Sequence, residues 1–69
     1  MKMEAVIGYL EEKFSNVIAT PKIAVWKTAA GGSAAVRRNK YGMMIVHLDG
    51  KVKGIGNTPD YVIQIIKGL

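Results

Sequence analysis

Positively charged side chains gather in the middle of this 69-residue chain, and such side chains bind phosphate groups or carboxylates. The segment from Lys22 to Lys53 holds seven lysines and arginines and a single acidic residue, Asp49, so its net charge is +6. The rest of the chain, with three basic and four acidic residues, has a net charge of −1. Small basic domains without a polyanionic partner are common, but this uneven distribution favours a surface that binds one.

The basic segment predicts a small, non-enzymatic protein that binds nucleic acid mainly through its phosphates, with weak sequence specificity. Arg37, Arg38 and Lys40 follow a run of small residues, and guanidinium groups pair well with phosphates. The predicted nucleic-acid contacts are Lys27, Arg37, Arg38, Lys40, Tyr41, Lys51 and Lys53. The alternative is a small protein-binding regulator or inhibitor, of phage or toxin–antitoxin type, that holds an acidic protein partner through the same basic loop and an exposed sheet face.

The residue types that enzymes and metal sites need are scarce. There is no cysteine and one histidine, His47, which excludes thiolate and multi-histidine metal sites. His47 is the one candidate general base at neutral pH, and strand alternation places it beside Ile45 and Val52 on a helix-covered face. We therefore expect no catalytic residue, no metal and no cofactor.

Hydrophobic periodicity predicts one α+β domain over residues 1–69. Apolar residues three and four positions apart indicate a helix over about 3–15, and a second helix follows Thr58. Lys22–Thr28 alternates as a strand, and two further strands flank Asp49-Gly50, which suits a two-residue hairpin turn. The predicted order is α-β-β-β-α, a three-stranded antiparallel sheet with two helices packed on one face. Residues at about 29–39 are expected to form a flexible loop.

The hairpin register predicts which sheet face stays open. A two-residue turn pairs Leu48 with Lys51, and the lysines should not face a helix-covered core. The open face would then carry an apolar interface for a homodimer or an obligate partner, formed by Met44, Val46, Leu48 and Ile55. Pairing along an exposed edge at Lys22–Thr28 is a second route to a dimer. A different turn length would reverse the two faces.

Hydropathy predicts no membrane association. No apolar run approaches the roughly 20 residues that span a bilayer. Glutamates interrupt the first apolar stretch, which is typical of a helix and not of a signal peptide. The expected location is the cytoplasm.

The hairpin run "NKYGMMIVHLDGKVKGIG" resembles the central part of double-stranded RNA-binding domains, whose "G-x-V-x-G-x-G" strand is matched by Gly50, Val52, Gly54 and Gly56. This resemblance implies an RNA-binding fold, so RNA is favoured over DNA. The chain also has a more distant resemblance to HicA-type toxins at Gly32-Ser33. Ala34 stands where those toxins have their catalytic histidine, so that resemblance implies no nuclease chemistry.

Overall fold

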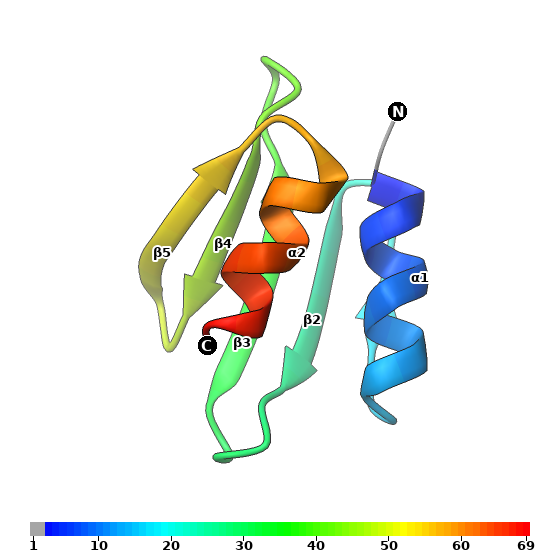
Figure 1. Cartoon of the computed structure of the whole chain (residues 1–69), viewed down its shortest axis with the longest axis vertical. Coiled ribbons are helices and arrows are strands. Elements are labelled where there is room, and N and C mark those ends of the chain that lie inside the picture. The colour runs from blue at the N-terminus through cyan, green and yellow to red at the C-terminus, as the bar shows by residue number, and fades with distance from the viewer. Residues whose placement is uncertain (1–2) are drawn as a thin grey trace.

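Two helices cover one face of a five-stranded antiparallel sheet, and the other face is open (Figure 1). The computed structural model describes residues 3–69, and its strands lie side by side in chain order, β1-β2-β3-β4-β5. The elements are α1 (Met3–Lys13), β1 (Ile18–Ala19), β2 (Ile23–Lys27), β3 (Ser33–Arg38), β4 (Met44–Leu48), β5 (Lys51–Gly56) and α2 (Pro59–Lys67). The predicted three-stranded α-β-β-β-α sheet is therefore wrong, because the structure has five strands between its helices.

The two additional strands are β1, which lies where the sequence predicts a turn, and β3, which lies inside the predicted loop at 29–39. Alanine has a low strand propensity, and this hides β3 in the sequence. Packing overrides that propensity, because Ala34 and Val36 face the helices and Ala34 lies opposite the bulky Trp26. The loop shrinks to a short turn closed by the Gly32 amide, which donates to Thr28 Oγ1 at 2.9 Å.

The sequence also predicted that the strand at Lys22–Thr28 lies at an exposed edge of the sheet, and the structure differs here as well. β2 lies inside the sheet, since it pairs with β1 at Ala24 and Val25 and with β3 from Ile23 to Lys27. The edges are β1, which has two residues, and β5, which has six. Pairing of two chains along Lys22–Thr28, as predicted from the sequence, is therefore wrong for this sheet.

The core lies between the helices and the sheet. Burial of aliphatic side chains of this size stabilises a fold by about 1.5–3 kcal/mol each. Phe14 closes one end of the core with its ring centroid 6.0 Å from that of Trp26. The buried residues of the core are Met3, Val6, Leu10, Ala24, Trp26, Ala34, Val36, Met44, Val46, Val62 and Ile66. The predicted start of the last helix is confirmed, because Thr58 Oγ1 accepts from the Tyr61 amide and Pro59 is the first helical residue.

The Asp49-Gly50 turn is confirmed, but the strands that leave it are not in the predicted register. Both turn residues have positive φ, 52° and 83°, and Leu48 pairs with Lys51. A bulge at Val46/His47 then shifts the pairing, so Val46 lies opposite Gly54 instead of Lys53.

The predicted exposure of the hairpin's apolar residues is therefore wrong for most of them. Met44 and Val46 are fully buried under the helices, and Leu48 packs against the same core. Of the four predicted interface residues, Ile55 alone is exposed, and it lies on the opposite face with Ile45.

Two glycines explain why the bulge is needed. A Cβ atom at Gly54 would lie 2.7 Å from Ile65 Cδ1, and one at Gly56 would lie 2.6 Å from Tyr61 Cδ2 and 3.0 Å from Val62 Cγ2. Real Cβ contacts are longer, so α2 can lie this close to β5 only above residues without side chains. The unbulged register would place the Lys53 side chain beneath the helix, where its charge would be buried without a partner.

We expect Gly54→Ala to lower the free energy of unfolding by about 1–3 kcal/mol, because the added methyl group forces Ile65 and α2 away from β5. The matched control is Gly8→Ala in α1, where a Cβ meets nothing within 4 Å. That change should raise stability by roughly 0.5–1 kcal/mol, since alanine favours a helix. Urea unfolding of both variants measures the difference. Equal changes in the free energy of unfolding for Gly54→Ala and Gly8→Ala would show that α2 does not need to lie so close to β5.

Candidate nucleic-acid interface

Two turns meet at one end of the sheet, although about 16 residues separate them in the sequence. The β1–β2 turn is held by Thr20, whose Oγ1 accepts from the Lys22 and Ile23 amides at 3.3 and 3.2 Å. The Arg38 amide donates to the Lys22 carbonyl at 2.9 Å, which joins this turn to the end of β3. The backbone thus fixes Lys22 and Arg38 next to each other.

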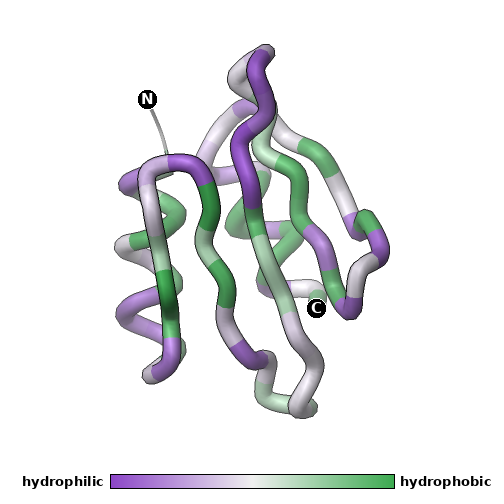
Figure 2. The backbone as a smooth tube through the Cα atoms, turned by 180° about the vertical axis from the view of Figure 1, so that it is seen from behind, coloured by the Kyte–Doolittle hydropathy of each residue, from purple (hydrophilic) through white to green (hydrophobic). Residues whose placement is uncertain are grey.

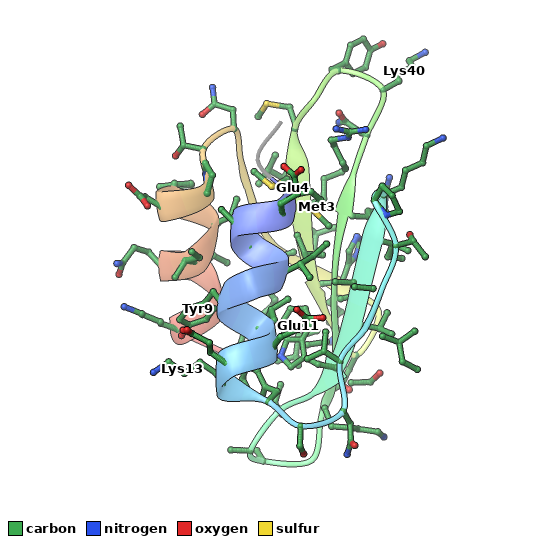
Figure 3. The ribbon with its side chains drawn as sticks, turned by 90° about the vertical axis from the view of Figure 1, so that its right-hand side faces the viewer. Met3, Glu4, Tyr9, Glu11, Lys13 and Lys40 are labelled. Carbon is green, nitrogen blue, oxygen red and sulfur yellow. The ribbon has the colours of Figure 1, made fainter. Side chains whose placement is uncertain are left out.

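Asn39 shapes the second turn, which links β3 to β4. Its Oδ1 accepts from the Tyr41 amide at 2.9 Å and from the Met43 amide at 3.0 Å. This is the local bonding by which asparagine replaces a backbone turn, and Gly42 supplies the positive φ of 82° that the turn requires. A defined turn therefore presents residues 40 and 41 at the tip of the β3–β4 hairpin, where Lys40 points into solvent (Figure 3).

Tyr41 is the most exposed of the large hydrophobic side chains, with 77% of its surface accessible. Lys40 Nζ lies 5.2 Å from the centroid of its ring, within the range of a cation–π contact. Contact of an exposed aromatic ring with water is unfavourable in free energy, and the ring adds no stability to the core. A partner with a flat π surface would remove that cost.

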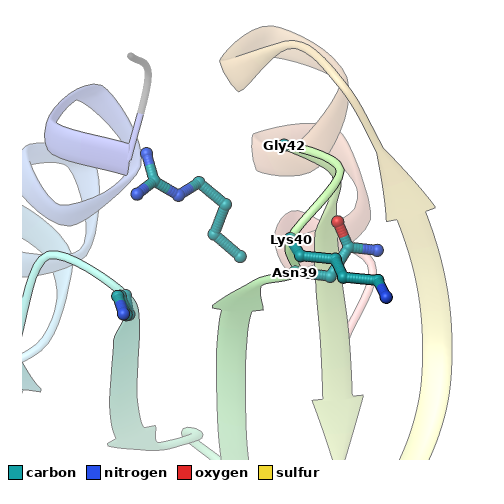
Figure 4. A pocket seen from close by; sticks show the side chains of 5 residues that line it. Asn39, Lys40 and Gly42 are labelled. Atoms are coloured by element: carbon teal, nitrogen blue, oxygen red, sulfur yellow. The ribbon is translucent and has the colours of Figure 1, made fainter.

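The same end of the sheet has a hollow of about 450 Å³ that is lined by Lys22, Arg38, Asn39, Lys40 and Gly42 (Figure 4). Three of these residues are cationic, and among the described residues no acidic side chain lines the hollow. Cations that share a concave site raise the local concentration of anions. We call Lys22, Arg38, Lys40 and Tyr41 the basic end.

Arg37 and Arg38 do not act as a pair, because neighbouring residues of a strand point to opposite faces. Arg37 lies on the open face of the sheet between Ile23 and Ile45. Arg38 lies on the helix side, where it also lines a second hollow together with Glu4 and Glu11 of α1. The two arginines therefore belong to different surfaces.

The remaining predicted contacts lie away from the basic end. Lys27 is at the far end of β2, opposite Ser33, and Lys51 directly follows the β4–β5 turn at that same far end. Lys53 lies at the bulge of the edge strand β5. The structure thus brings together Arg38, Lys40 and Tyr41 of the predicted set and adds Lys22. Sequence reasoning missed Lys22 as a site residue because it did not recognise β3, whose pairing with β2 brings Arg38 to Lys22.

The open face of the sheet, which is turned to the viewer in Figure 2, carries exposed aliphatic residues, whereas the apolar surface was predicted on the other side of the hairpin. Alternation and strand register place two rows of side chains across it. One row is Ile23, Arg37, Ile45 and Ile55, and the other is Ile18, Val25, Ala35, His47 and Val52. Four of these aliphatic side chains are exposed.

His47 lies in the second of these rows, so the prediction that it faces the helices is wrong. It is half-buried, and its Nε2 is shielded from solvent without a hydrogen-bond partner among the described residues. A substrate would not reach this atom without rearrangement of the face. Over residues 3–69 no three histidine, cysteine or acidic side chains are grouped as a metal site would need.

Comparison of the chain with family models, with curated proteins and with solved structures found no match. Within the described part of the chain, neither helix is long and apolar enough to cross a membrane. The function is therefore argued from the geometry of the basic end.

Proposed function

We propose that this protein binds single-stranded nucleic acid, RNA in preference to DNA, through its basic end and without catalysis. The observation that carries the proposal is the hollow lined by Lys22, Arg38 and Lys40, next to the turn that carries the exposed ring of Tyr41. Phosphates beside an unstacked base match this combination of cations and an aromatic ring. RNA offers such unpaired segments in its loops and ends, which is why RNA is favoured.

Each residue of the basic end has a separate task. The Arg38 guanidinium can donate two parallel hydrogen bonds to one phosphate, whereas Lys22 and Lys40 neutralise neighbouring phosphates as point charges. Tyr41 stacks on a base, and the bonds from the Tyr41 and Met43 amides to Asn39 order the backbone that carries the ring before binding. Prior ordering of the turn reduces the entropy lost when the strand binds.

Sequence specificity should be weak, because base reading requires side chains that enter a groove. The helices are unsuited to this role. Glu4, Glu11 and Glu12 are exposed on α1, so phosphates would repel this helix. On α2, the charge of Asp60 is balanced by Lys67, so this helix does not attract phosphates through its net charge. Stacking on one tyrosine accepts any base, since every base has a π face.

The first test measures the salt dependence of binding to fluorescein-labelled oligo(U) RNA of 12 nucleotides. If the three cations of the basic end neutralise three phosphates of a single strand, log affinity should fall with log salt at a slope of about −2. The double variant Arg38→Ala/Lys40→Ala removes two of these contacts, so its slope should be shallower by about 1.4. Fluorescence anisotropy between 50 and 300 mM salt gives both values.

The matched control is Lys51→Ala/Lys53→Ala, which removes the same charge from the far end of the hairpin and its edge strand. This variant should keep most of the affinity and nearly all of the salt slope. Equal losses in the two double variants would contradict the proposed site, because binding would then depend on total charge alone.

The second test separates nucleic acid from an acidic protein, which the three cations of the basic end could also bind. Tyr41→Ala should weaken oligo(U) binding by about 5- to 150-fold, the value of one stacked base, and leave the salt slope unchanged. Tyr41→Phe keeps the ring and should bind like the wild type. Poly-glutamate is the competing probe. If it binds as tightly as the RNA, and Tyr41→Ala changes neither affinity, an acidic protein partner replaces nucleic acid in this account.

A further inference from the structure

The open face exposes more aliphatic side chains than a surface that contacts water alone would carry. Ile18, Val52, Ile55 and Ile23 are 72, 56, 48 and 39% exposed, and Ile45 lies between the last two in the same row. Ile18 and Ile23 lie on the neighbouring strands β1 and β2, and Val52 and Ile55 lie on β5. Ala35 on β3 and Ile45 and His47 on β4 connect the two groups across the face. Contiguous patches of this kind on small proteins mark interaction sites.

The face is large enough for a stable dimer. The two longer dimensions of the molecule are 30 and 22 Å. A face of 30 by 22 Å measures about 660 Å², so two copies in full face-to-face contact would bury at most roughly 1,300 Å² in total, at the lower end of the 1,200–2,000 Å² of specific protein complexes. Two sheets stacked in this way form the aliphatic layer, about 10 Å thick, that is found inside β-sandwiches.

The charges on the face favour a second copy of the chain as the partner. On β3, Arg37 and Ser33 lie two residues to either side of Ala35. The Ser33 amide donates to Asp49 Oδ1 at 3.0 Å, so a fixed carboxylate stands at the Ser33 end. A cation and an anion thus lie on opposite sides of one central residue, which is a self-complementary arrangement.

We propose that the open faces of two copies pack against each other around a two-fold axis that crosses the strands at Ala35. Rotation about this axis places Arg37 of each copy over Ser33 and beside Asp49 of the other, which gives two ion pairs at equivalent positions. The row with Val25, His47 and Val52 then meets its own counterpart, so Val25 and Val52 lose their contact with water. The same rotation exchanges the two ends of β2, so Ile23 lies over the aliphatic stem of the partner's Lys27.

Lys51 follows the Asp49-Gly50 turn but pairs with the helix-side residue Leu48. Among the described residues, Lys27 is the further cation on the open face at this end, since it pairs with Ser33. Its flexible stem lies at the end of β2 and can carry the ammonium group past the sheet into solvent, whereas the carboxylate of Asp49 is held by its hydrogen bond. Association through the sheet edges is less favourable. β1 has two residues, and β5 carries two lysines and a bulge, which are features that prevent edge pairing.

This dimer is independent of nucleic-acid binding. Lys40 projects from the end of the sheet (Figure 3), and Tyr41 in the same turn is exposed. The hollow of the basic end is lined by the helix-side residue Arg38. The dimer would leave both basic ends open, at opposite ends of the assembly. Failure of one proposal therefore leaves the other standing.

Sedimentation equilibrium of the nuclease-treated protein tests the dimer between 5 and 500 μM. The wild type should reach twice the monomer mass in this range. Val52→Glu places a carboxylate opposite its own copy, so it should weaken association by at least about 100-fold. Val52 is 56% exposed in the single chain, which allows the variant to fold. Val52→Thr keeps the branched shape and should weaken association by no more than about 10-fold.

Two further variants test the proposed ion pairs between Arg37 and Asp49. Arg37→Glu brings two carboxylates together across the interface and should weaken association by at least about 10-fold, most strongly at low salt. Asp49→Asn keeps an acceptor for the Ser33 amide and tolerates the φ of 52° at this position, so it should cost a few-fold. A wild type that stays monomeric at 500 μM would overturn the proposal and assign the face to a different protein. A dimer that survives both Val52→Glu and Arg37→Glu would overturn it as well.

Discussion

The close packing of α2 on Gly54 and Gly56 determines which face of the sheet the helices cover. The absent side chains let Ile65 and Tyr61 approach the β5 backbone, and the bulge at Val46/His47 brings both glycines under the helix. Once this register is set, the alternation of side chains along a strand fixes the face to which each residue of β4 points. Every second side chain enters the core, and the residues between them are turned to the open face.

This constraint separates the molecule into surfaces of different chemistry. Glutamates are exposed on α1, aliphatic side chains lie on the open face, and cations line the hollow where the β1–β2 and β3–β4 turns meet. A chain of this length has little core to lose, so a partner on the open face would add apolar burial that the monomer lacks. Binding of a polyanion at the end of the sheet needs no such burial, because its strength is electrostatic.

Local chemistry made part of this structure predictable from sequence. Asp49-Gly50 and Thr58-Pro59 act within a few residues, and both elements are where the sequence places them. Strand β3 is different, since its alanines favour a strand only when Trp26 lies opposite Ala34. The bulge likewise depends on α2, and the proximity of Lys22 to Arg38 depends on two turns far apart in the chain. These long-range contacts leave no periodic signal in the sequence, and so the sheet size, its open face and part of the site could not be predicted.

The claim that the basic end binds single-stranded nucleic acid is tested most directly by an NMR titration of the ¹⁵N-labelled protein with unlabelled oligo(U) RNA. Amide signals from Thr20, Lys22 and residues 38–42 should shift progressively and saturate, because these backbone segments carry the cations and the stacking ring. Signals from Lys27 and Lys51, at the far end of the sheet, should stay in place. Shifts centred on the far end, or spread evenly over every lysine and arginine, would contradict the account.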